Sequence, residues 1–234
     1  MLILLSVTSD AVTQSKDIMI KQIAPQTQSI FPIRLIYKSL PKYGFIKRIS
    51  SGVTLLVGEG NLSFTCALAR KIAFIHKIIT STHEKCSELS DETKHNVRAL
   101  NKMKIHVMHG IDGTKLHDIF RISSIDTIIF QFPHTGSREP INGKNSNYVL
   151  VYNFLNSSFQ MLKKGGAVLI TIVDNDYYND MFKLEKLAIL AGFRKPTKYA
   201  FDPNDYIGYK HTMTHHDGSA LENHNKFATW EFKL

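Results

Sequence analysis

Cysteine is scarce in this sequence, and long hydrophobic runs are missing. The 234 residues include two cysteines, Cys66 and Cys86, which form neither a CxxC pair nor a disulfide framework. This excludes a disulfide-stapled secreted domain and favours a reducing compartment. No apolar run approaches the ~20 residues that a membrane-spanning helix needs. The apolar residues 1–7 follow no basic stretch and are shorter than a typical signal-peptide core, so we expect neither a signal peptide nor membrane attachment.

Acidic residues are also few, with 20 Asp and Glu against 29 Lys and Arg, which gives a net charge of +9. Residues 1–50 hold seven basic and two acidic residues and therefore contribute +5 of that charge. A basic excess favours a polyanionic partner, nucleic acid above all, although a solvated basic surface would have the same composition. We predict a basic N-terminal extension over residues 1–50 and one domain over residues 51–234.

From residue 51 onward, short apolar runs alternate with longer stretches of helical spacing. The runs predict parallel strands at residues 53–57, 77–81, 105–109, 125–130 and 167–173. The stretches between and after them predict helices at residues 64–71, 91–102, 148–162 and 178–191. Residues 226–234 alternate as an edge or antiparallel strand does. The pattern is typical of an α/β fold with a doubly wound, mostly parallel sheet and helices on both faces.

Two helix ends have sequence signals. Asn61 or Ser63 is expected to cap the helix over residues 64–71, because short polar side chains accept hydrogen bonds from the free N–H groups of a first turn. The run of two lysines and two glycines at residues 163–166 is expected to end the helix over residues 148–162.

In an open α/β sheet, ligands bind beyond the carboxyl ends of the strands. That rule selects the loops at residues 58–63, 81–84, 110–113 and 131–136. In the first of them, Gly58 and Gly60 allow close approach of a ligand to the backbone. Leu62 and Ser63 stand where a dinucleotide fingerprint has small residues, so a cofactor without phosphates fits better than a pyrophosphate. A plain strand-to-helix turn is the alternative.

The third and fourth loops contain candidate polar contacts. Asp112, flanked by glycines, can accept a hydrogen bond from an adenine amino group, or it can simply cap a turn. His134, after the stiffening Pro133, can act as a base near neutral pH, or it can be an ordinary surface histidine.

The C-terminal part contains an acidic and aromatic loop at residues 201–209. Tyr206 and Tyr209 could stack there on an extruded base, or they could pack on the body of the domain. Further on, the sequence has His211, His215, His216 and His224. No cysteine or carboxylate accompanies these histidines at ligand spacing, so we expect no metal site.

Together these segments resemble the Rossmann-like domain of the 25S ribosomal RNA (uridine-N3) methyltransferases. The resemblance covers roughly residues 53–234, with the matching pieces in the family's order. The pieces are LLVGEGNLSF (55–64), TS (80–81), HGIDGTKL (109–116), IIFQFPHTG (128–136), LKKGG (162–166) and FDPNDYIGY (201–209). The first and fourth are specific to the family, whereas the lysine–glycine turn is common to many methyltransferases.

The resemblance implies a seven-stranded methyltransferase sheet, S-adenosylmethionine as the methyl donor, and N3 of a uridine in large-subunit ribosomal RNA as the acceptor. The methionine and ribose parts of the donor would face Gly58, Glu59, Gly60, Asn61 and Ser63. The adenine would face Asp112, and the ribose position falls on His83, where the family usually has an acidic residue and Glu84 follows one step later. Methyl group and base would meet among Gln131, which replaces the family's usual asparagine, Phe132, Pro133 and His134.

From these positions we expect His134 or Asp205 to accept the imino proton and Gln131 to orient the uracil carbonyls. Proximity and orientation would supply much of the acceleration. We further expect a monomer, in the cytoplasm or in the nucleolus of a eukaryote. Three alternatives stay open: an RNA-binding module that has lost donor binding, a methyltransferase acting on a protein or small molecule, and a nicotinamide oxidoreductase, which the incomplete glycine fingerprint disfavours.

Overall fold

The computed structural model describes residues 40–50, 52–72, 77–137, 139–212 and 219–234. Contacts divide the chain between Pro41 and Lys42. The sequence prediction placed this boundary at residue 50, and the structure moves it towards the N-terminus, because helix α3 (Phe45–Ile49) belongs to the domain. Its side chains Phe45 and Ile49, four residues apart on one helix face, are buried in the core. The rest of the predicted extension, residues 1–39, lies outside the described residues.

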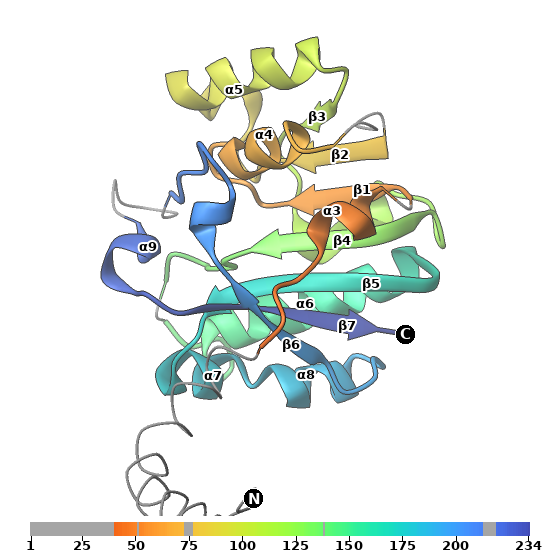
Figure 1. Cartoon of the computed structure of the whole chain (residues 1–234). Coiled ribbons are helices and arrows are strands. Elements are labelled where there is room, and N and C mark those ends of the chain that lie inside the picture. The colour runs from red at the N-terminus through yellow and green to blue at the C-terminus, as the bar shows by residue number, and fades with distance from the viewer. Residues whose placement is uncertain (1–39, 51, 73–76, 138, 213–218) are drawn as a thin grey trace, which may run out of the picture. The chain divides into compact units, whose positions relative to one another are not determined.

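A seven-stranded sheet forms the centre of the domain, in the order β3-β2-β1-β4-β5-β7-β6 (Figure 1). β7 pairs antiparallel with β5 and β6, and the other pairings are parallel. The strands are β1 (Thr54–Val57), β2 (Ile78–Ser81), β3 (His106–Met108), β4 (Ile125–Gln131), β5 (Leu162–Val173), β6 (Thr197–Phe201) and β7 (Phe227–Lys233). The last predicted strand is therefore antiparallel, but it lies inside the sheet and β6 forms the edge.

Helices cover both faces of the sheet, as predicted for a doubly wound fold. One face packs against α3, α4 (Ser63–Ala69) and α5 (Asp91–Lys102), and the other against α6 (Ser146–Met161), α7 (Asp176–Phe182) and α8 (Leu184–Leu190). In Figure 1, α3 and α4 lie in front of the sheet and α6 behind it. The remaining described elements are the short helix α9 (Ala220–Asn223) and the 3-10 turns η2 (Cys86–Glu88), η3 (Gly113–Asp118) and η4 (Pro203–Asp205).

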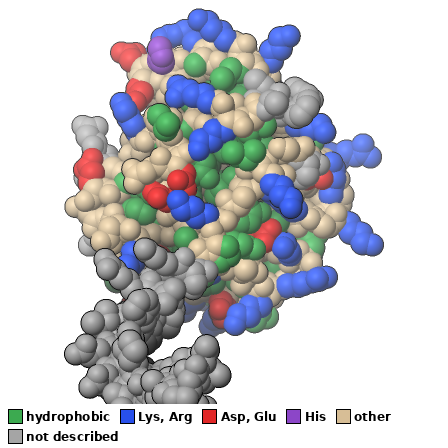
Figure 2. Space-filling model, viewed as in Figure 1, with side chains coloured by type: hydrophobic (Ala, Val, Ile, Leu, Met, Phe, Trp, Pro, Cys, Tyr) green, Lys and Arg blue, Asp and Glu red, His purple; other side chains and the backbone are tan. Residues whose placement is uncertain are grey.

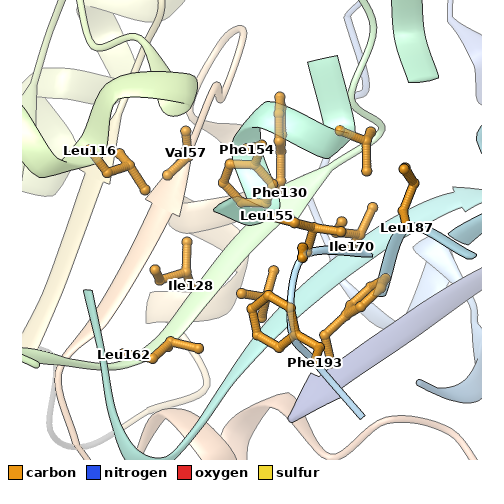
Figure 3. Close-up of a cluster of buried hydrophobic side chains, with 14 of the residues drawn as sticks. Val57, Leu116, Ile128, Phe130, Phe154, Leu155, Leu162, Ile170, Leu187 and Phe193 are labelled. Atoms are coloured by element: carbon orange, nitrogen blue, oxygen red, sulfur yellow. The ribbon is translucent and has the colours of Figure 1, made fainter. Parts of the chain in front are cut away.

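Strand β5 shows how the sequence builds both faces at once. Val168 and Ile170 belong to the core under α6, where Figure 3 shows Ile170, whereas Leu169 and Val173 belong to the core under α3 and α4. Successive side chains of a strand point to opposite faces, so a strand that is apolar at every position is buried on both. This explains why the segment is the most apolar of the predicted strands.

Three local predictions are wrong. Residues 163–166 do not end a helix, because α6 stops at Met161 and β5 starts at Leu162. The predicted helix over residues 178–191 is two helices, α7 and α8, separated by Lys183 in a left-handed conformation with φ of 48°. The cap of α4 is Leu62, also left-handed, although the side chain of Asn61 still accepts the N–H of Ser63 at 3.0 Å.

Candidate functional site

A cavity of about 670 Å³ lies beyond the carboxyl ends of the parallel strands, where all four selected loops contribute to its walls. Figure 1 shows this edge of the sheet on the left, where the arrowheads of β1 and β4 end. The predicted site residues in its lining are Gly58, Glu59, Gly60, Asn61, His83, Asp112, Gln131, Phe132, His134 and Tyr209.

The loop after β1 brings its backbone to the cavity through Gly58. This glycine has φ of 65°, and a Cβ atom on it would lie 2.7 Å from Cε2 of Phe130. No other residue fits both the backbone conformation and the space. The loop is anchored to the neighbouring strand, because the N–H of Glu59 donates to the carbonyl of Ser81 at 2.9 Å.

The side chain of Glu59 links this loop to the first turn of α4. Its carboxylate is buried and accepts hydrogen bonds from the N–H of Thr65 at 3.1 Å and from the Thr65 hydroxyl at 2.9 Å. Burial raises the pKa of Glu59 to about 7, even though both hydrogen bonds favour the charged form. The side chain therefore positions the loop and the first turn of α4.

Asn61 joins the first loop to a distant segment, residues 210–212. Its amide nitrogen donates to the carbonyl of Lys210 at 3.0 Å and to the hydroxyl oxygen of Thr212 at 2.8 Å. Ser63 adds a bond with the N–H of Lys210 at 2.9 Å. These contacts place Lys210, His211 and Thr212 in the cavity wall.

Asp112 caps a turn and also lines the cavity. One carboxylate oxygen accepts the N–H of Thr114 at 2.8 Å and its hydroxyl at 2.7 Å, so the residue caps η3. Partial burial opposes ionisation, but the bonds from Thr114 outweigh it and lower the pKa of Asp112. Asp112 also lines the cavity, with His83 and the less exposed Glu84 nearby in its wall.

The segment at the end of β4 differs from the other walls because it has buried polar atoms without a hydrogen-bond partner among the described residues. The amide nitrogen and oxygen of Gln131 are buried and have no hydrogen-bond partner among the described residues. Phe132 has φ of 49°, a conformation that costs roughly 1–3 kcal/mol in a non-glycine residue and is common near functional sites. Its ring contacts His211, with centroids 4.8 Å apart.

His134 and His211 both line this part of the cavity. Nδ1 of His134 accepts the N–H of Gly136 at 2.8 Å. The neutral ring therefore has its proton on Nε2, where it is a donor, and this bond argues against the predicted proton acceptor. Burial, with a smaller contribution from His134, lowers the pKa of His211 to about 4, so His211 is neutral at physiological pH.

Four predicted site residues do not line the cavity. The Asp205 carboxylate lies 2.7 Å from Nζ of Lys42, and Tyr206 is buried in an aromatic cluster, stacked on Phe201 with centroids 5.5 Å apart. Ser63 and Pro133 are buried outside the cavity lining. Tyr206 therefore packs on the body of the domain, and base stacking by its ring is excluded in this arrangement.

The charge of the lining restricts the ligand. Five carboxylate residues line the cavity with one lysine, and this lysine, Lys210, pairs with Glu92 at 3.3 Å. The carboxylates belong to Glu59, Glu84, Glu88, Glu92 and Asp112. An acidic wall repels a pyrophosphate and favours a ligand that has a positive charge.

Sequence reasoning missed one wall of the cavity. Lys210, His211 and Thr212 reach it through hydrogen bonds that span up to 151 positions of the chain, and no local pattern marks such a contact. The only signal was position, because these residues directly follow the aromatic loop. His215 and His216 lie outside the described residues.

Two known proteins share part of their sequence with this chain. Heavy metal-associated isoprenylated plant protein 41 of Arabidopsis thaliana is 28% identical over 179 residues, which are 71% of this chain and 34% of that protein. Ferredoxin-fold anticodon-binding domain-containing protein 1 of Homo sapiens is 28% identical over 173 residues, 68% of this chain and 27% of that protein. The chain thus spans about a third or less of the length of these two relatives.

The fold matches a crystal structure of a SAM dependent methyltransferase from Archaeoglobus fulgidus with a TM-score of 0.50 and 10% identity, over 81% of this chain and 90% of that chain. At that identity the likeness shows the fold alone. None of the helices in the described residues has the length and apolar character needed to cross a bilayer. A family model described as BMT5-like, rRNA (uridine-N3-)-methyltransferase BTM5-like, matches residues 55–213. The match covers more than half of the chain, and the chain therefore belongs to this family of ribosomal RNA methyltransferases.

Proposed function

We propose that this protein transfers a methyl group from S-adenosylmethionine to N3 of a uridine in large-subunit ribosomal RNA. The observation that supports it most is the acidic cavity at the carboxyl edge of the sheet, in a chain of this family. An rRNA substrate also implies a place in the cytoplasm or the nucleolus, and a monomer remains our expectation.

The residues present fit this donor. The backbone at Gly58 lines the cavity without a side chain of its own, and the wall beside it is acidic rather than basic. Asp112 would take the adenine, and Glu84 would take the ribose hydroxyls in place of the family's usual acidic residue, because Glu84 lies in the cavity wall beside His83. The wall therefore still has a carboxylate, that of Glu84, although His83 stands where the family usually has an acidic residue.

The groups around Gln131 would receive the base. When bound, the donor supplies an electrophilic methyl group on a positively charged sulfur. The unpartnered amide of Gln131 is ready to donate to a uracil carbonyl and so to stabilise the charge that develops when N3 loses its proton. His134, protonated on Nε2, would donate to the second carbonyl. Both side chains would orient the base and stabilise the imidate, and water would take the imino proton.

The pH dependence distinguishes this role of His134 from the role of a base. If His134 donates a hydrogen bond, kcat/KM should keep rising above about pH 7, until the imino group itself ionises. If His134 accepts the proton, kcat/KM should instead level off near that pH. Replacement of His134 by Gln, which retains a donor, should preserve more activity than His134→Ala.

The test of the function is transfer of labelled methyl from S-adenosylmethionine to ribosomal RNA, followed by mass spectrometry of the nucleosides. We expect N3-methyluridine with the full chain and a strong loss with Gln131→Ala. Label in a different nucleoside would refute the uridine-N3 assignment, and label in protein with none in RNA would support the rival class of substrate. Donor binding without transfer to any substrate would favour a non-catalytic module.

A further inference from the structure

A second hollow lies at the start of α6 and against α7 and α8, with a volume of about 450 Å³. We call it the lysine groove. Its lining consists of Lys144, Asn145, Tyr148, Tyr177, Asp180, Met181, Lys183 and Lys186. None of these residues takes part in the cavity described above.

Two sharp backbone features fix lysines of this groove in place. Lys144 ends a tight turn in which Ile141 and Lys144 exchange backbone hydrogen bonds of 2.8 and 3.0 Å, and Asn142 and Gly143 between them have positive φ. Lys183 is the left-handed residue that separates α7 from α8. The corner at Lys183 turns the chain into α8, whose first turn contributes Lys186 to the same hollow.

The lysine groove is joined to the cavity by direct contacts. Thr135 lines the cavity, and its N–H donates to the side chain of Asn147 at 2.8 Å. The amide nitrogen of Asn147 in turn lies 3.8 Å from Sδ of Met181, which lines the groove. A ligand bound in the groove would therefore lie close to the loop after β4, which would receive the base; Asn147 is the one residue between the two linings in this series of contacts.

Its chemistry suits nucleotides. Lys183 pairs with the exposed Asp180 at 3.4 Å, whereas Lys144 and Lys186 make no ion pair among the described residues. Tyr177 is 64% exposed and lies perpendicular to the ring of Tyr178, with centroids 5.3 Å apart, so this contact leaves at least one face of the Tyr177 ring for a flat partner. Lysines beside exposed aromatic rings bind single-stranded nucleic acid, through phosphates and stacked bases respectively.

We propose that the lysine groove binds the unpaired nucleotides next to the target uridine. The inference rests on the proposed function for the identity of the RNA, but its evidence is separate. An acidic protein segment would satisfy the lysines, yet it would leave the exposed face of Tyr177 without a flat partner. A single strand satisfies both, and it also lets the target base leave the stack and enter an acidic cavity that repels its phosphate.

The test measures binding of the full chain to a fluorescein-labelled oligouridine of about ten nucleotides by anisotropy. Tyr177→Ala should weaken binding at least about fivefold, whereas Tyr177→Phe, which keeps the ring, should not. Replacement of Lys144 and Lys186 by alanine should lower the slope of log affinity against log salt by about 1 to 1.5. The matched controls are Ile189→Ala, on the exposed side of α8, and Lys164→Ala, on β5 outside both hollows; both should bind like the parent.

Equal affinities for Tyr177→Ala and Ile189→Ala would overturn the proposal, as would an unchanged salt slope in the double lysine variant. Displacement of the oligouridine by poly-glutamate at equal charge concentration would favour an acidic protein partner instead. Calorimetry with S-adenosylmethionine tests the proposed function separately from this inference. If the protein does not bind S-adenosylmethionine but its RNA binding still depends on the groove residues, the proposed function is refuted and the inference about the groove stands.

Discussion

The cavity and the lysine groove lie at the same edge of one sheet and differ in two respects. The cavity lining has five acidic residues and one lysine, whereas the groove lining has three lysines and one aspartate. Glu59 and Asn61 in the cavity lining are buried and hydrogen-bonded within the protein, whereas Tyr177 in the groove is largely exposed. We infer that the residues facing the donor also hold the fold together, and that RNA affinity can be changed without loss of stability. Figure 2 shows lysine and arginine side chains around the upper and right-hand rim of the visible face as well.

The largest effect is expected at Gly58. An alanine there combines a strained positive φ with a Cβ atom 2.7 Å from Cε2 of Phe130, and the two should lower the free energy of unfolding by roughly 3–5 kcal/mol. Urea unfolding monitored by circular dichroism measures it. Gly60→Ala is the matched control, since its Cβ atom would have an ordinary contact of 3.6 Å with Thr212, and it should cost less than about 1 kcal/mol.

A smaller loss for Gly58→Ala than for Gly60→Ala would show that the first loop yields easily. That result would contradict the inference that the residues facing the donor also stabilise the fold.

The second effect is a pH dependence at Glu59. Burial raises the pKa of this carboxyl from 4.5 in the unfolded chain to about 7 in the folded protein, so folding favours the protonated form. Its contribution to stability is complete below pH 4.5 and is lost as the pH rises to about 7, a loss on the order of 3 kcal/mol. Glu59→Gln should remove this slope and make the protein more stable than the parent at pH 8.

Thermal unfolding between pH 5 and pH 8 checks this, within the window that the shifted pKa of Glu59 defines. Thr65→Val provides a further arm, because it removes a hydroxyl that favours the ionised form and should move the slope to higher pH. A parent and a Glu59→Gln variant with the same slope would place the titration elsewhere.

Gln131, unlike Gly58, should matter for methyl transfer and not for stability. Its buried amide has no partner among the described residues, so Gln131→Leu should leave the free energy of unfolding unchanged or raise it by up to about 1 kcal/mol. Methyl transfer should nevertheless fall at least about 100-fold, because a donor to the developing charge is lost. Gln160→Leu, on the exposed end of α6, is the control for both measurements.

The smallest stability effect is expected in the lysine groove. Tyr177→Ala removes a side chain that is 64% exposed, and it should change the free energy of unfolding by less than about 0.5 kcal/mol while RNA affinity falls. A loss of 2 kcal/mol or more in urea unfolding would mean that Tyr177 is part of the core and that the two regions are not as different as their exposure indicates.

Most of the first cavity wall could be predicted from the sequence. Apolar runs that stop at glycines locate strand ends, and parallel strands bring those ends to one edge, which is how Gly58, Asp112 and Gln131 were placed together. The hydrogen bonds of these side chains could not be predicted from the sequence. Asp112 caps η3 as well as lining the cavity, and the amide nitrogen of Asn61 donates to residues 210–212.

What failed depends on contacts between distant parts of the chain. The glycines at residues 165 and 166 have a turn-like composition, yet they fall inside β5, in an irregular stretch between Leu162, which pairs with Ile125 of β4, and Ala167, where regular pairing resumes. Lys183 has ordinary helix propensity, and tertiary packing of α7 and α8 overrides it at the corner. Asp205 was placed in the site by its neighbours in sequence, whereas its ion pair with Lys42 turns it away.

Calorimetric titration of the full chain with S-adenosylmethionine, and in parallel with a nicotinamide dinucleotide, tests the central claim that the acidic cavity holds the methyl donor. We predict a single saturable site for S-adenosylmethionine, weakened by Asp112→Ala, and no heat of binding for the dinucleotide, whose pyrophosphate the carboxylates repel. No heat with S-adenosylmethionine at millimolar concentration, or equal binding of the dinucleotide, would contradict the account.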